Sequence, residues 1–248
     1  MQSGEEFFHT SFTDNDHLWM TSSYTLRKTV GILGMSMPLL LYISLYIDAG
    51  LPQPLESISH YYYTRASGVF VAVLSTLAIF LMIYKGKSVV DLLVSLVAGV
   101  AALMVVFFPT DNLAPACCDL TKRYAVTYLK DSDSRTLFHY ISAGVFLGCL
   151  AYMSFFLFTR SDKPRHLRSP EKVLRNRIYR VCGVLMVLAM ALMFFGGFLE
   201  WIPEDRYSGN KLTFWMETVA VEAFGFSWLV KGETLFRDRQ RPVSLKAT

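Results

Sequence analysis

The chain has 248 residues, of which 53% are hydrophobic, and it carries a formal net charge of +4. A soluble domain is about 45–50% apolar, and the excess here is gathered into long blocks that favour a membrane protein. The positive charge does not indicate a nucleic-acid-binding protein, because Lys and Arg flank the apolar blocks and form no basic stripe interleaved with aromatic residues.

The first 29 residues are polar and rich in acidic side chains. They lack the cationic start and the short apolar core of a cleavable signal peptide. We therefore expect the first apolar block, 30–47, to stay in the membrane as a signal anchor. Pro38 lies in the middle of this block and predicts a kinked helix, because neighbouring helices can satisfy the carbonyl that proline leaves free.

The second and third blocks, 66–84 and 89–108, are joined by only a few residues. This short connection predicts a tight antiparallel pair of helices. In the fourth block, Gly144 and Gly148 lie four positions apart, a spacing that lets helix backbones approach closely in a membrane. Close packing of another helix against this pair is therefore expected.

Every apolar block is long enough to cross about 30 Å of hydrocarbon at about 1.5 Å per residue. The sequence therefore predicts an all-α fold, a polytopic bundle of six transmembrane helices that occupies residues 30–230. The predicted spans are 30–47, 66–84, 89–108, 137–159, 181–199 and 212–230.

The distribution of Lys and Arg predicts that both termini lie in the cytoplasm. With this orientation, residues 1–29 form a polar cytoplasmic segment and residues 231–248 a basic cytoplasmic tail. The inner loop between Arg160 and Arg180 then carries the densest run of basic residues. Such a loop can attract anionic lipid headgroups, which makes anionic lipid a candidate partner beside the bilayer itself.

Two glutamates fall inside the last predicted span, and ionisable groups at that depth are costly. Glu222 lies near the middle of 212–230, and Glu217 lies closer to its start. One interpretation makes Glu222 an ion or proton site or a ligand anchor. The other makes it a protonated or hydrogen-bonded packing residue, and both interpretations stay open.

The predicted topology brings a second set of ionisable residues to the outer face. They are His60, Asp111, His139, Glu200 and Glu217. These side chains can line a pocket that opens outward, or they can simply face water. His60, Asp111 and His139 are also weak candidates for a divalent metal site. The sequence predicts no cofactor.

The segment 57–65 contains three consecutive tyrosines followed by Thr64 and Arg65. Tyrosines at this position are typical of the aromatic belt at the membrane interface. Alternatively, the segment lines a pocket, in which Tyr62 and Arg65 contact an anionic headgroup or a small acid.

Six short stretches resemble a group of uncharacterised bacterial multi-pass membrane proteins. They are SISHYYYT (57–64), VFV (69–71), YKG (84–86), FPT (108–110), SA (142–143) and RNRIYRVCG (175–183). The resemblance implies the inner (plasma) membrane of a bacterium and implies no activity. The alkaline ceramidase and adiponectin-receptor superfamily is less similar, because its zinc-binding HxxxH pair is missing and the last histidine here is His166.

Three functions are compatible with these features. The first is binding or translocation of a small molecule or lipid through a polar pocket open to the outer face. The second is a role as an assembly or sensing subunit of another membrane protein, and the third is a membrane-embedded metal-dependent hydrolase. The sequence contains no GxSxG, no HExxH and no glycine-rich phosphate loop, which favours a non-enzymatic function.

Overall fold

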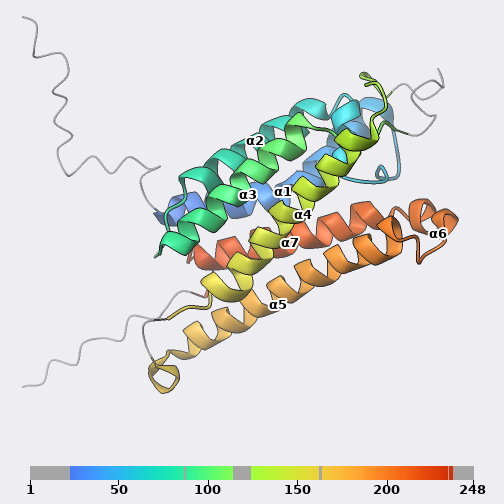
Figure 1. Ribbon diagram of the computed structural model, residues 1–248. Coiled ribbons are helices and arrows are strands. Elements are labelled where there is room, and N and C mark those ends of the chain that lie inside the picture. Colours follow the sequence, from blue (N-terminus) through green and yellow to red (C-terminus); the bar gives the residue numbers. More distant parts are fainter. Residues whose placement is uncertain (1–22, 87, 114–123, 162–163, 234, 237–248) are drawn as a thin grey trace, which may run out of the picture.

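The computed structural model describes residues 23–86, 88–113, 124–161, 164–233 and 235–236 (Figure 1). The prediction of an all-α fold is confirmed, since the described residues form helices and one isolated β-bridge between Thr64 and Ala125. The α-helices are α1 (Ser23–Ala49), α2 (Ser67–Ile83), α3 (Val89–Phe107), α4 (Asp133–Tyr152), α5 (Pro170–Leu192), α6 (Glu204–Gly209) and α7 (Leu212–Lys231). Residues 1–22 and 237–248, parts of the predicted terminal segments, lie outside the described residues.

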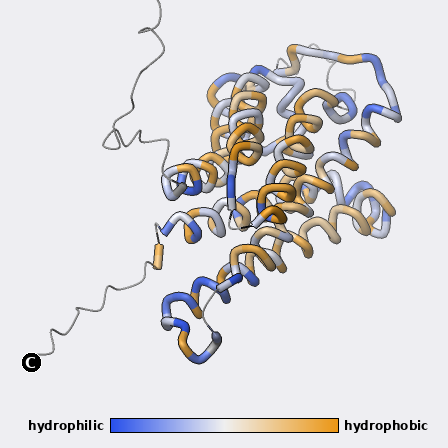
Figure 2. Tube along the Cα trace, turned by 60° about the vertical axis from the view of Figure 1, so that its left-hand side comes forward, coloured by the Kyte–Doolittle hydropathy of each residue, from blue (hydrophilic) through white to orange (hydrophobic). Residues whose placement is uncertain are grey.

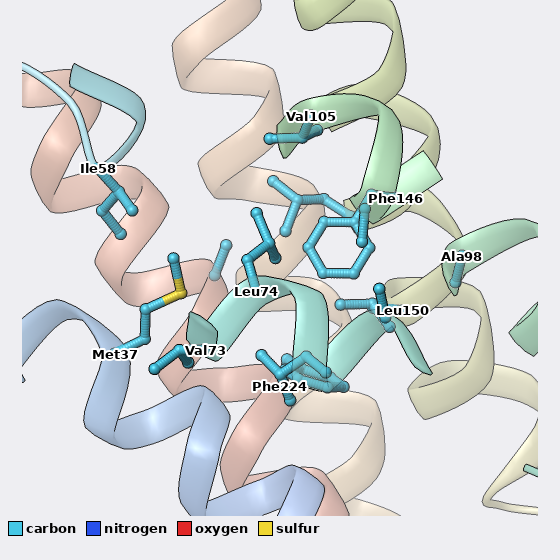
Figure 3. Packing of buried hydrophobic residues seen from close by; sticks show 14 of the residues in the cluster. Met37, Ile58, Val73, Leu74, Ala98, Val105, Phe146, Leu150 and Phe224 are labelled. Atoms are coloured by element: carbon cyan, nitrogen blue, oxygen red, sulfur yellow. The ribbon is translucent and has the colours of Figure 1, made fainter. Parts of the chain in front are cut away.

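Six of these helices form a closed ring. Along the chain α1 packs on α2, α2 on α3, α3 on α4 and α4 on α5; α7 then packs on both α5 and α1 and closes the ring (Figure 1). The close packing of α2 on α3 agrees with the short connection between them. Leu74, Val105, Phe146, Leu150 and Phe224 belong to the buried cluster that fills the middle (Figure 3).

Four segments are long and apolar enough to cross a membrane. They are Tyr24–Ala49, Val89–Phe107, Asp133–Leu157 and Pro170–Phe198. The 17-residue helix α2 is apolar but shorter, and α7 carries Glu217 and Glu222, which lower its mean hydropathy.

Apolar side chains also cover the outside of the ring, as expected for helices that face lipid. On α5, Val184, Leu185, Val187 and Leu188 are all exposed. Figure 2 shows apolar residues along the middle of the helices and hydrophilic residues at their ends and in the connections. This distribution matches a hydrocarbon layer between two polar interfaces.

Three helices begin earlier than their apolar blocks. Helix α1 starts at Ser23, α4 at Asp133 and α5 at Pro170, so half of the predicted loop 160–180 is helical. Ser169 caps α5, because its Oγ accepts the backbone N–H of Lys172 at 3.2 Å, and Pro170 occupies the first turn, where no backbone donor is needed. Hydropathy detects the lipid-facing part of a helix and misses polar turns that extend beyond it.

Helices α1 and α7 approach closely at Gly31 and Gly225. A Cβ on Gly225 would lie 2.7 Å from the carbonyl oxygen of Gly31, and a Cβ on Gly31 would lie 2.8 Å from the carbonyl oxygen of Gly225. The expected close packing at Gly144 and Gly148 is wrong: a Cβ on Gly144 meets nothing within 4 Å, and one on Gly148 meets only Met190, at 3.9 Å.

Candidate functional site

Consecutive helices of the ring run in opposite directions, so polar residues gather at two ends. One end holds the segment 57–65, and we call it the tyrosine end. The other holds the start of α5 and the end of α7, and we call it the cationic end; it lies on the left in Figure 1.

At the tyrosine end, residues 59–63 form the short 3-10 helix η2 (Ser59–Tyr63). Tyr61 and Tyr63 are fully buried, and the hydroxyl of Tyr63 donates a 2.5 Å hydrogen bond to the carbonyl of Thr110. Burial raises the pKa of Tyr63 to about 12, so its hydroxyl keeps its proton. Tyr62 is partly buried against the rings of Tyr63 and Phe70. Two of the three tyrosines therefore pack inside the protein and do not form an interfacial belt.

His139 is buried on α4 with both ring nitrogens hydrogen-bonded. Its Nδ1 lies 2.8 Å from the carbonyl oxygen of Phe108, and its Nε2 lies 3.0 Å from the Oγ of Ser59. A carbonyl only accepts, so Nδ1 carries the proton and Nε2 accepts the hydroxyl of Ser59. His139 therefore connects η2 to the end of α3.

His60 is also buried but has one unsatisfied nitrogen. The Oγ of Ser57 accepts the backbone N–H of His60 at 3.2 Å and lies 3.1 Å from Nδ1. The Asp111 carboxylate near Nε2 favours the tautomer with the ring proton on Nε2, a buried atom without a hydrogen-bond partner among the described residues. Burial lowers the pKa of His60, against the opposing effect of the Asp111 carboxylate, so the ring is neutral at pH 7.

Asp111 lies 3.9 Å from Nε2 of His60 and is about half exposed. Its Oδ1 accepts hydrogen bonds from Thr110 at 2.6 Å and from the hydroxyl of Tyr140 at 3.3 Å. The structure thus brings His60, Asp111 and His139 to one place. Among the described residues, however, no three His, Cys, Asp or Glu side chains lie close enough to hold a metal ion.

Glu217 lies at the same end and has a different partner. Its Oε2 accepts the backbone N–H of Ile58 at 2.6 Å. Close by, the backbone N–H of Phe214 donates to the backbone carbonyl of Glu56. The side-chain carboxylate of Glu56 pairs with Lys211 at 3.3 Å. Glu217 therefore anchors the segment before η2 onto α7.

The other candidate residues do not join this cluster. Arg65 is exposed and pairs with Asp48 at 3.0 Å, and Glu200 is exposed just after the π-helix Met193–Phe198, which continues α5. Glu222 is partly buried, and no hydrogen bond links it to another described residue. The predicted set thus separates into one cluster and several independent residues.

The cationic end contains a cavity of about 920 Å³ between the ends of α1, α2, α3, α5 and α7 and the π-helix η3 (Met153–Leu157), which continues α4. Six Lys or Arg side chains line it, against two carboxylates. The cations are Arg27, Arg160, Arg168, Lys172, Arg175 and Lys231, and the carboxylates are Asp91 and Glu233.

Two of these cations converge on one carbonyl. The Nζ of Lys172 lies 3.3 Å from the carbonyl oxygen of Phe158, and the Nζ of Lys231 lies 3.5 Å from the same atom. Both ammonium groups also lie over the ring of Tyr179, at 6.0 Å and 5.9 Å from its centroid, and Lys231 lies over the ring of Phe158 at 5.2 Å. Phe158 follows η3, where helix-end carbonyls lack intrahelical donors.

Arg160 also lines the cavity and is held by the start of α3. Asp91 closes a capping box with Ser88 and is 5% exposed. The guanidinium of Arg160 lies 3.5 Å from the Asp91 carboxylate and donates to Ser88 Oγ at 2.9 Å. Arg27, from α1, lies over the rings of Tyr24 and Tyr84 at 5.7 Å and 5.6 Å.

The sequence predicted part of the positively charged lining of this cavity. The basic loop from Arg160 to Arg180 was identified as a possible anion-binding surface, and four of the six lining cations come from it. The contributions of Arg27 and Lys231 were missed, because nothing in the sequence shows that the two ends of the described chain meet the loop. The only signal was that both residues flank predicted spans on the same side of the membrane.

No protein-family model, curated protein or solved structure matches this chain.

Proposed function

We propose that this protein spans the membrane six times and binds a small molecule or lipid headgroup in the cavity at its cationic end. The cavity carries this proposal. At about 920 Å³ it has the size of a small-molecule site, and aromatic rings and charged groups from distant parts of the chain converge on it.

The closed ring supports six spans. The shorter α2 lies between α1 and α3, and the more polar α7 lies between α1 and α5, so both are flanked by segments that are able to cross a membrane. An even number of spans places both termini on one side. The excess of Lys and Arg at the cationic end assigns that side to the cytoplasm, and the resemblance to bacterial proteins favours the inner membrane.

The proposed ligand site lies at the cytoplasmic face, whereas the sequence favoured a pocket open to the outer face. At the tyrosine end, most polar groups of the cluster bind one another, as Ser59 binds His139. At the cationic end, like charges are held together around open volume. Open volume lined by an excess of one charge is the arrangement that suits a ligand of opposite charge.

The experiment is native mass spectrometry of the protein purified in mild detergent. We expect a stoichiometric bound mass in the wild type. The variant S161W fills the cavity, because Ser161 is a partly buried residue of its lining. The control S208W makes the same replacement at Ser208, a partly buried residue at the other end of the bundle. The bound mass should disappear in S161W and persist in S208W. Retention in S161W, or no bound mass in the wild type, would contradict the proposal.

A second candidate is ligand binding at the tyrosine end, favoured by the unsatisfied Nε2 of His60 beside Asp111. A hydroxyl group suits this pair, because it can accept from Nε2–H and donate to the carboxylate. The same mass spectrometry separates the two candidates. A bound mass that survives S161W and is lost in H60Q would favour the tyrosine end.

A further inference from the structure

Exposed aromatic side chains gather at the tyrosine end, and they are not the consecutive tyrosines of the segment 57–65. They come from the end of α1, the end of α3, the start of α4, the connection that follows α5, and the start of α7. We call this set the aromatic girdle, and its members are Tyr46, Phe107, Tyr140, Trp201 and Trp215. Their exposed fractions run from 47% to 72%, whereas Tyr61 and Tyr63 are fully buried.

The clearest part of the girdle follows the π-helix η5 (Met193–Phe198), which continues α5. A Cβ on Gly197 would lie 2.6 Å from the hydroxyl of Tyr207, so this glycine lets α6 fold back against the helix. Tyr207 is partly buried there, while Phe195 and Trp201 stay 41% and 72% exposed. These two side chains contact each other, with 4.8 Å between their ring centroids. A protein that builds an exposed aromatic surface of this kind has a use for it in binding.

The apolar outer face of α5 continues into this aromatic surface. The stretch 181–199 carries no charged residue, and Glu200 follows it directly. Val184 and Leu188 on this stretch are exposed, as expected for residues that face lipid. At about 1.5 Å per residue the stretch is about 28 Å long, close to the thickness of the hydrocarbon layer. A helix that spans the layer with this stretch places Trp201 just beyond it, among the headgroups.

Two other helices place the same boundary at their girdle residues. On α1, Tyr46 lies just before Asp48, which pairs with Arg65 at 3.0 Å. On α4, the exposed Tyr140 donates its hydroxyl to Asp111 at 3.3 Å. Each girdle side chain thus has apolar helix surface on one side and charged groups on the other. Aromatic side chains in such surroundings are typical of the interface between hydrocarbon and water.

We propose that the aromatic girdle binds the headgroup region of the membrane and fixes the depth of the tyrosine end in it. This inference rests on the proposed six spans, and it adds the depth at which they lie. It also has a consequence for the cluster at this end. The Asp111 carboxylate, which accepts from Tyr140, then lies at the level of the headgroups, where it is reached from water and not from the hydrocarbon.

The test measures the depth of Trp201 by quenching of its fluorescence in phosphatidylcholine nanodiscs. The signal of Trp201 is the difference between the wild type and W201F, a replacement that keeps an aromatic side chain. The lipids carry a nitroxide either near the headgroup or near the end of the acyl chain. The label near the headgroup should quench Trp201 at least about twofold more strongly than the deep label. Stronger quenching by the deep label would overturn the inference.

Two other tryptophans provide matched controls through the variants W215F and W228F. Trp215 belongs to the girdle and should show the same preference for the label near the headgroup. Trp228 is fully buried inside the bundle, so neither lipid label should quench it.

Acrylamide, a quencher dissolved in water, separates the remaining outcomes. Quenching of Trp201 by acrylamide without quenching by either lipid label would place it in water. Protection from all three quenchers would show that a protein, such as a second copy of this chain, covers the surface. Each of these results overturns the inference. A bound mass that is sensitive to S161W would still support the proposed ligand site in either case, because that measurement does not depend on the girdle.

Discussion

The surroundings of the two histidines at the tyrosine end favour opposite tautomers. His139 carries its proton on Nδ1, because that atom faces the carbonyl of Phe108, whereas the Asp111 carboxylate favours a proton on Nε2 of His60. His139 therefore satisfies both ring nitrogens, and His60 satisfies one. The sequence identified both residues as candidates of equal standing, and only the geometry separates a structural histidine from one with an unsatisfied donor.

The buried position of His60 predicts that acid destabilises the protein. Its pKa in the folded state lies below the ordinary value of 6.5, so between these two values the unfolded chain binds a proton that the folded chain does not. The stability is therefore complete above pH 6.5 and falls as the pH decreases below it.

Thermal unfolding in detergent at about pH 7.5 and about pH 5.5 checks this prediction. The wild type should lose more of its Tm between the two conditions than H60Q, because glutamine at position 60 does not titrate. An equal loss of Tm in both proteins would show that His60 does not contribute.

At the scale of elements, hydropathy predicted the ends of α2, α3 and α7 to within one residue but missed the starts of α1, α4 and α5. The fifth helix begins at Pro170 and not at 181, because the Ser169 cap and about three turns rich in charged residues precede its apolar part. Glycine spacing indicated Gly144 and Gly148, whereas α1 and α7 approach closely at Gly31 and Gly225. Which face of a helix meets a neighbour depends on how all six helices close the ring, and no single helix carries that information.

Alanine substitutions at two helical glycines test the α1–α7 crossing. Alanine has the higher helix propensity by about 1 kcal/mol, so G144A, whose Cβ meets open space, should keep or raise the Tm. G225A should lower it, because the new Cβ would lie 2.7 Å from the carbonyl oxygen of Gly31 and 2.5 Å from Met35 Cγ. A higher Tm for G225A than for the wild type would show that α1 and α7 do not approach so closely.

At the scale of the whole molecule, the ring explains why the cavity forms where it does. Helices that run alternately up and down bring the start of α1, the start of α5 and the end of α7 to one end, although these segments are far apart in the sequence. The sequence predicted the helical class and the positive charge of this end. It could not predict the cavity, because the pairing of Lys172 with Lys231 depends on α7 lying between α1 and α5.

An experimental structure of the protein in nanodiscs of native lipid tests the central claim most directly. We predict six helices across the bilayer and non-protein density in the cavity at the cationic end. Side chains that close the cavity, or a position of α2 or α7 outside the hydrocarbon layer, would contradict it.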